Sequence, residues 1–316
     1  MIIELSDTNT KEIADELLSD QEANSMATGR VLTLIVVASA TDDVECILDT
    51  VREASHEHPA RVLVMLTDKD RKESRLDARV IVGRDSGASE LVVMRLSGEM
   101  ADHLGSVVTP LLLPDTPIVA WWPVSAPARP SDHYVGRIAQ RRVTNARHNV
   151  SGNALLRLTS GYAPGDSDMM WSRITTWRGI VASALDRYPH ERVESAVVSG
   201  PADNPSVDIA AGWLAHRLGV TVERRINTPE DYPQTRVEGA NLFPIHSLVL
   251  NRASGPISIS VQDESTVRIS LPDSPDAQVA MSVRTESDCL SEELRHLDAD
   301  VAYAAALQGL GLVTVD

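Results

Sequence analysis

Aromatic side chains are scarce in this chain of 316 residues, since they make up 3% of the sequence and phenylalanine occurs once. The hydrophobic fraction of 43% is nevertheless ordinary for a globular protein, so the composition does not indicate disorder. We therefore expect cores that depend on Val, Leu, Ile and Ala. The length is sufficient for two domains, each with its own core.

Cysteine is almost absent too. Cys46 and Cys289 are far apart in the sequence and belong to no C-x-x-C pair. The chain therefore lacks the dense cysteine pattern of a disulfide-bonded secreted domain, which fits a reducing cytoplasm. We expect both cysteines to be small buried or half-buried side chains.

Targeting and membrane segments are missing as well. The first ten residues, M-I-I-E-L-S-D-T-N-T, have neither the basic nor the apolar region of a secretion signal. The longest apolar run, residues 31–40, includes polar residues and falls far short of the roughly 20 residues that span a bilayer. These observations predict a soluble, cytoplasmic protein.

Positive charge is in deficit. The sequence has 29 basic and 45 acidic residues, which gives a net charge of −16. Nucleic acid and anionic membranes both require a positive face on the protein, so neither is an expected partner. A local basic pocket is still compatible with this charge, and so is a basic protein partner.

Motifs for cofactors and covalent chemistry are also missing. The turn after the first predicted strand is S-A-T-D-D, which lacks G-x-G-x-x-G and places two acids where a pyrophosphate would bind. The sequence contains neither G-x-x-x-x-G-K-[ST] nor G-x-S-x-G. We therefore predict no cofactor and no catalytic residues. One weak anion-friendly feature is the turn at Ser199 and Gly200 before a predicted helix, where backbone amides could meet a phosphate.

His56 and His58 flank Glu57 in a pattern that resembles a metal site. On a helix, however, residues two positions apart do not share a face, and no cysteine ligand is nearby. Histidine near the C-terminus of a helix is favoured by the helix dipole alone. The sequence therefore predicts no metal.

What the first half does contain is a repeated alternation of strands and helices. Residues 31–38, V-L-T-L-I-V-V-A, are typical of a strand that is buried on both faces. Asp42 and Glu45 then predict the capped start of a helix. The alternation predicts a Rossmann-like, mostly parallel sheet without the dinucleotide fingerprint, and with some antiparallel edge. The predicted strands are residues 31–38, 61–67, 79–82, 90–96 and 118–122.

After residue 165 the pattern changes. The stretch G-D-S-D-M-M-W-S-R-I-T-T-W-R predicts a long helix at about residues 168–187, with Asp166 or Ser167 as its cap and Asp168 in its first turn. Short alternating strands between about residues 221 and 284 predict an antiparallel meander. Two short helices are expected after it, which makes this half an α+β domain.

The expected organisation has three parts. Residues 1–28 are an acidic N-terminal helix and linker, in which Ile13 and Leu17 have helical spacing. Residues 29–165 are the Rossmann-like α/β domain, and residues 166–316 are the α+β domain.

Two tryptophans stand side by side in the proline-rich stretch of residues 110–123, P-L-L-L-P-D-T-P-I-V-A-W-W-P. Neighbours on a strand point to opposite faces, so Trp121 and Trp122 cannot both enter one core. We expect one tryptophan in a core and the other at a contact surface. The alternative is core packing of both, because large aromatics are mostly buried.

Several stretches occur here in one order: A-S-H-E-H-P-A-R-V, the proline–tryptophan stretch, Q-R-R-V-T-N-A, G-D-S-D-M-M-W-S-R-I-T-T-W-R, A-G-W-L-A-H-R-L-G-V and, near the end, L-S-E-E-L-R-H-L-D-A-D-V-A-Y. Together they resemble the glucose-6-phosphate dehydrogenase assembly protein family, OpcA, in its actinobacterial form. The resemblance covers nearly the whole chain.

The resemblance implies a non-catalytic helper that binds glucose-6-phosphate dehydrogenase and favours its active oligomeric state, in support of the oxidative pentose phosphate pathway. Cyanobacterial relatives are linked with thioredoxin-dependent control, but two unpaired cysteines do not support that role here. The alternative is a sugar-phosphate sensor, or an enzyme, that uses a degenerate α/β site.

As a hypothesis, the surface that contacts the dehydrogenase includes arginines and tryptophans of these motifs, because both residue types are favoured at interface hot spots. For Arg141 and Arg142, the alternative is a solvated or salt-bridged strand edge. The candidates are Trp121, Trp122, Arg141, Arg142, Arg173 and Trp177.

Overall fold

The structure is a computed structural model that describes residues 2–23, 31–82, 90–148, 154–187, 190–228 and 243–316. The chain forms two compact units, and each of them takes segments from distant parts of the sequence. The three-part division into domains stays a proposal. Unit 1 consists of Met1–Gly152, Gly161–Met169 and Glu286–Ala299, and unit 2 of Asn153–Ser160, Met170–Thr285 and Asp300–Asp316.

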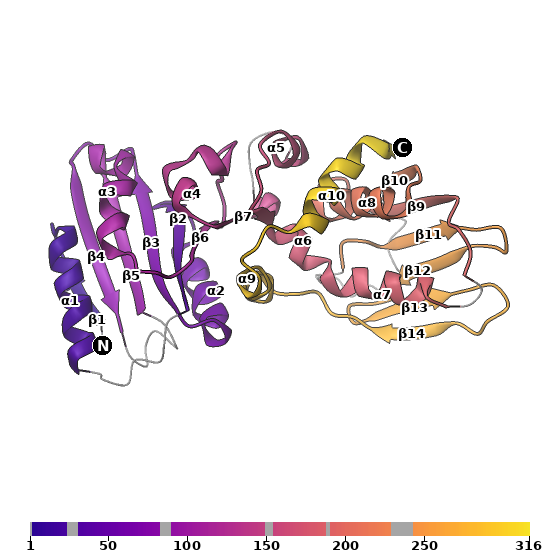
Figure 1. Ribbon diagram of the computed structural model, residues 1–316, viewed down its shortest axis with the longest axis horizontal. Coiled ribbons are helices and arrows are strands. Elements are labelled where there is room, and N and C mark those ends of the chain that lie inside the picture. The colour runs from indigo at the N-terminus through magenta and orange to yellow at the C-terminus, as the bar shows by residue number, and fades with distance from the viewer. Residues whose placement is uncertain (1, 24–30, 83–89, 149–153, 188–189, 229–242) are drawn as a thin grey trace. The chain divides into compact units, whose positions relative to one another are not determined.

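Unit 1 is built on an eight-stranded sheet (Figure 1). Six strands lie side by side in the order β5, β3, β2, β6, β7 and β8, and each pairs with its neighbours among these six in parallel. Strands β4 and β1 extend the β5 edge with antiparallel pairing. The predicted mostly parallel sheet with an antiparallel edge is therefore confirmed. The spatial order is β1 (Ile2–Leu5), β4 (Arg75–Ile81), β5 (Glu90–Ser97), β3 (Ala60–Asp68), β2 (Leu32–Ser39), β6 (Ile118–Trp122), β7 (Arg141–Thr144) and β8 (Asp166–Asp168).

The central strands β2 and β3 follow from their composition. Residues 32–38 of β2 and 60–66 of β3 are all buried, as expected for aliphatic strands that are covered on both faces. Helix α2 (Val44–Glu57) connects them, but Asp43 is its N-cap and accepts the Cys46 N–H. The carboxylate of Asp42, predicted as the cap, accepts the Ser39 N–H instead.

Helices α1 (Thr10–Ala23) and α3 (Leu104–Val108) cover one face of this sheet, and α2 lies on the other (Figure 1). Ile13 and Leu17 of α1 are buried in one cluster with Val107 of α3 and Trp122 of β6. The amphipathic N-terminal helix predicted from the spacing of Ile13 and Leu17 therefore packs on the sheet. Strand β1, which precedes it, was not predicted.

The predicted long helix at about residues 168–187 is wrong at its start. Asp166–Asp168 is strand β8, and the helical part is divided into α6 (Met169–Arg173) and α7 (Thr175–Leu185) by Ile174. The two aspartates do not cap a helix because their carboxylates accept hydrogen bonds from β7 and its neighbourhood. Tertiary partners therefore override a local pattern that is typical of a helix start.

Unit 2 contains a seven-stranded sheet. The antiparallel meander is confirmed for β11 to β14, and residues 229–242 of the predicted range lie outside the described residues. Strand β10 is parallel to β9, not part of the meander, because helix α8 (Pro205–Leu218) returns the chain as a crossover. The order is β14 (Ala277–Ala280), β13 (Thr266–Ser270), β12 (Ile257–Val261), β11 (Ser247–Asn251), β9 (Ser195–Gly200), β10 (Val222–Ile226) and β15 (Val313–Val315).

Helices α8 and α10 (Val301–Gly309) approach each other closely through two glycines. A Cβ at Gly212 would overlap the carbonyl oxygen of Ala306, and a Cβ at Gly309 would overlap that of Gly212. Glycine is therefore required at both positions. Helix α9 (Glu286–Arg295), which precedes α10 in the sequence, belongs to unit 1 and packs there against α2. Among the described helices, none combines the length and apolarity that a membrane span requires.

Candidate functional site

Two of the sequence motifs meet at the β7–β8 edge of the sheet in unit 1. Arg142 of β7 lies opposite Asp166 of β8 in the strand register, and the Nε of Arg142 donates to the Asp166 carboxylate. The same guanidinium donates to the carbonyl oxygens of Pro164 and, at 3.0 Å, Ala139. Both side chains are 9% exposed, so this is a buried and multiply bonded ion pair.

Burial raises the pKa of the Asp166 carboxyl, while the hydrogen bonds from Arg142 and the Ala163 N–H favour its charged form. Asp168, two residues further along β8, is completely buried. Its carboxylate accepts the Thr144 hydroxyl at 2.6 Å and the Ala146 N–H at 3.0 Å. These contacts attach β8 to β7 and to the residues that follow β7.

Arg141 points to the opposite side of β7, as neighbours on a strand do. Its guanidinium donates to the carboxylate of Glu293 on α9, with the Nε at 3.1 Å, and to the backbone oxygen of Asp298 at 2.9 Å. The side chain of Asn145 donates to Glu286 at the start of α9, at 2.8 Å. The Q-R-R-V-T-N-A segment therefore holds α9 in unit 1.

Trp121 and Trp122 are both buried, each with 1% of its surface exposed. The indole Nε1 of Trp121 lies 3.1 Å from the sulfur of Met169. Trp122 belongs to the core cluster on the α3 face, and its ring meets His133 edge-on at a centroid distance of 5.5 Å. Both indoles therefore pack inside, including the one expected at a contact surface.

Arg173 and Trp177 lie in unit 2 and are buried too. The guanidinium of Arg173 donates to the Arg284 carbonyl at 2.7 Å, and Trp177 packs against Trp213 with ring centroids 6.1 Å apart. The structure thus brings together the four candidates of unit 1 and, separately, the two of unit 2. All six side chains contact other parts of the chain, and the hypothesis that they contact the dehydrogenase stays a prediction.

Sequence reasoning missed the partners of these arginines. Glu293 and Asp298 lie in the stretch L-S-E-E-L-R-H-L-D-A-D, which predicts a helix but carries no sign of its partner. One sequence feature could have pointed to the pair of Arg142 and Asp166, because both residues stand in motifs of unusual composition. No pattern along the chain joins an arginine to an acid that is 152 positions away.

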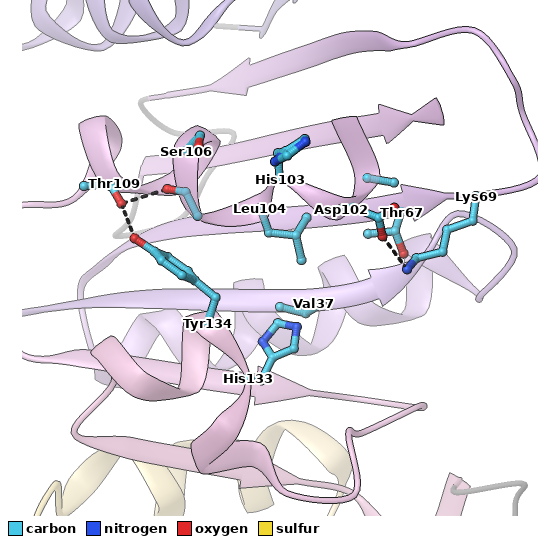
Figure 2. Close-up of a pocket in the computed structure, with 12 residues that line it drawn as sticks. Val37, Thr67, Lys69, Asp102, His103, Leu104, Ser106, Thr109, His133 and Tyr134 are labelled. Carbon is cyan, nitrogen blue, oxygen red and sulfur yellow. Dashed lines mark hydrogen bonds and ion pairs between the residues drawn. The ribbon is translucent and has the colours of Figure 1, made fainter. Parts of the chain in front are cut away.

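A cavity of about 580 Å³ lies at the carboxyl ends of β2 and β3 (Figure 2). Val37 and Thr67 come from these strands, residues 101–106 and Thr109 from η2 (Gly98–Asp102), α3 and η3 (Thr109–Leu111), and His133 and Tyr134 from the segment that follows β6. Sequence reasoning did not find this site, since its residues come from separate segments without a shared motif.

Polar side chains in this cavity are already connected by hydrogen bonds. The Thr109 hydroxyl donates to the Gly105 carbonyl at 2.7 Å, so the Tyr134 hydroxyl, 3.0 Å away, must donate to Thr109. The Lys69 ammonium donates to Asp102 at 2.7 Å, and this bond lowers the pKa of the Asp102 carboxyl. Figure 2 shows the two bonded pairs toward opposite ends of the group of residues.

His133 combines a structural and a polar role at the cavity. Its Nδ1 accepts the Val135 N–H at 3.3 Å at the start of α4 (Tyr134–Ile138), so the neutral ring carries its proton on Nε2. Burial lowers the pKa of His133, and the positive charges of Arg137 and Lys69 lower it further. The ring is therefore neutral at pH 7.

Comparison with known proteins identifies two matching family models. One model describes the N-terminal domain of a glucose-6-phosphate dehydrogenase subunit and matches residues 51–160. The other describes the C-terminal domain of the same kind of protein and matches residues 164–307. The two models occur in their natural order and together cover most of the chain.

A curated protein of Synechocystis sp., "Putative OxPP cycle protein OpcA", is 29% identical over 143 residues, which are 41% of this chain and 29% of the relative. The match therefore spans less than a third of the relative's length. A solved structure described as "Trehalose-6-phosphate from E. coli bound with UDP-2-fluoro glucose" covers 63% of this chain and 66% of its own, with 8% identity and a TM-score of 0.25. A TM-score this low carries no argument about fold or function.

Proposed function

This chain belongs to the OpcA family of glucose-6-phosphate dehydrogenase assembly proteins, and from that premise we propose that it binds this dehydrogenase and favours its active oligomeric state. The observation that carries the proposal is the ordered match of both family domains to residues 51–160 and 164–307. The role is non-catalytic and supports the oxidative pentose phosphate pathway. We further propose that the chain is of the actinobacterial type and acts in the cytoplasm.

The physical form of this role is thermodynamic linkage. A factor that binds one oligomeric state of an enzyme more tightly than another shifts the population toward that state, by no more than the difference in affinity. A population shift from 1:99 to 99:1 requires about a 10⁴-fold preference. Strong activation therefore predicts strong discrimination between the states of the dehydrogenase.

The buried motif residues support this role indirectly. Arg141 and Asn145 fix α9, and α9 carries exposed polar residues such as Asp288 and Arg295. A rigid element with an exposed polar side loses little conformational entropy when it binds a partner. We therefore propose that Arg141 of β7 acts by positioning α9, in addition to any contact that it makes in the complex.

Mixing experiments with the dehydrogenase of the same organism test the proposal. Activity and mass by light scattering are measured for each protein alone and for the mixture. The expected result is a mass shift that coincides with increased activity at a fixed dehydrogenase concentration. A complex without any change in activity would reduce the chain to a scaffold, and the absence of a complex would overturn the proposal.

A further inference from the structure

The cavity of Figure 2 occupies a special place in the sheet of unit 1. From β2, the strands β3 and β5 follow in one direction and β6, β7 and β8 in the other, so the strand order reverses between β2 and β6. Val37 of β2 and His133, after β6, line the cavity from the two sides of this reversal. In open parallel sheets, ligands bind outside the carboxyl ends of the strands at such a position.

The polar groups of the cavity suit hydroxyl groups. The Tyr134 oxygen donates its proton to Thr109 and keeps lone pairs that accept a hydrogen bond. The His133 ring carries a donor on Nε2, and the Ser106 hydroxyl can donate and accept. The Thr67 hydroxyl donates to the Ala38 carbonyl at 3.3 Å and keeps lone pairs that accept. Hydroxyls on a ligand donate and accept at once, so a wall of mixed donors and acceptors matches them.

The charge of the cavity suits one anionic group. Asp102 is the single acid among the described residues that line it, although the chain as a whole carries a net charge of −16. The Lys69 ammonium is bonded to this acid, and the Lys69 side chain is 67% exposed, so it can also reach a ligand. Arg137 adds positive charge near His133. The lining thus balances one lysine against one acid, with Arg137 as additional positive charge beside it, in a chain that is strongly acidic overall.

We propose that this cavity binds a small polyhydroxylated molecule with one anionic group, the chemical class that sugar monophosphates represent. Its volume of about 580 Å³ lies within the range of small-molecule sites. The absence of a glycine-rich phosphate loop after β2 argues against a dinucleotide. Lys69 binds the anionic group, and Tyr134 and His133 bind hydroxyls at the other part of the cavity.

Gly105 supports this assignment. A Cβ at this position would overlap the Tyr134 ring, so glycine allows the ring to lie against α3 with its hydroxyl on Thr109. The substitution Gly105→Ala is therefore expected to displace Tyr134 without changing any charge.

Calorimetric titration of the full chain tests the proposal, with glucose 6-phosphate, glucose and inorganic phosphate as separate probes at equal ionic strength. We expect the sugar phosphate to bind at least about tenfold more tightly than either part alone. Lys69→Gln removes a charged donor and should weaken the binding of the sugar phosphate about tenfold or more. Tyr134→Phe and Gly105→Ala should each weaken it several-fold.

Lys72→Gln is the matched control, because Lys72 is exposed in the same connection and does not line the cavity. It should leave binding unchanged. Binding of the sugar phosphate no tighter than that of phosphate would overturn the proposal, as would equal losses in Lys69→Gln and Lys72→Gln. The dehydrogenase is not part of this titration, so the result is independent of the proposed assembly role.

Discussion

Arg141 of β7 and Glu293 of α9 form a buried ion pair between residues that are 152 positions apart in the sequence. The two side chains are 4% and 2% exposed. The Arg141 guanidinium also donates to the backbone of Asp298, so it holds the late segment Glu286–Ala299 of unit 1 both on α9 and close to the end of the segment. The pair therefore determines where α9 lies in unit 1.

Glu293→Gln is expected to destabilise the chain by about 3 kcal/mol, because it leaves the Arg141 charge buried without its counter-charge. Urea denaturation followed by circular dichroism measures this loss. Glu292→Gln is the matched control, since Glu292 is a neighbour on α9 that pairs with the half-exposed Arg295. Its effect should stay below about 1 kcal/mol. Equal losses in the two variants would contradict the importance of the buried pair.

Asp168→Asn is expected to cost about 1–3 kcal/mol of stability. The carboxylate is fully buried and accepts hydrogen bonds from Thr144 and Ala146, and an amide provides weaker, uncharged acceptance together with donors of its own. Thermal unfolding monitors the change. Asp186→Asn, at an exposed helix end, should be nearly neutral, and a comparable loss there would remove the special role of Asp168.

Two glycines in unit 2 should respond in opposite directions to alanine. Gly212→Ala is expected to destabilise by about 1–3 kcal/mol, because the added Cβ overlaps the Ala306 carbonyl of α10. Gly179→Ala lies within α7, where no atom is near the added Cβ, and should stabilise by about 0.5–1 kcal/mol. Denaturation midpoints of the two variants compare them directly. Stabilisation by Gly212→Ala would show that α8 and α10 can separate at low cost.

His133 should titrate below 6.5, the ordinary value for histidine, because burial and the charges of Arg137 and Lys69 lower its pKa. A base with a lowered pKa binds protons more readily in the unfolded chain. The linked stability is therefore fully present above pH 6.5 and is lost as the pH falls through the folded pKa. NMR titration of the histidine rings measures the midpoint.

His133→Asn assigns the signal and serves as the control variant. Asparagine can accept the Val135 N–H as a helix cap but does not titrate. The variant should therefore keep α4 intact and lose this part of the pH dependence. A His133 midpoint at or above 6.5 would contradict the lowered pKa.

The sequence was informative wherever local composition decides the structure. Strands β2 and β3 are continuous aliphatic runs, and the crossover between them has to be helical, so the centre of the first sheet was predictable. The meander from β11 to β14 was predictable because Gly, Pro and Asp turns separate short alternating strands.

Other features depend on partners that no local pattern reveals. Aspartates before an apolar stripe are typical of a helix start, yet Asp166 and Asp168 extend the sheet because Arg142 and Thr144 bind their carboxylates. The direction of β10 is set by pairing with β9, not by its own residues. The cavity could not be predicted either, since it is assembled from segments that share no motif.

The position of α9 has a consequence for biosynthesis. Translation adds about 5–20 residues per second, so the interval between the synthesis of Gly152 and Ala299 is on the order of ten seconds. During that time the nascent chain carries α2 without α9 and Arg141 without Glu293. Ribosome-bound chains of this length are therefore expected to be a substrate for chaperones, and unit 1 closes only after Glu286–Ala299 has been synthesised.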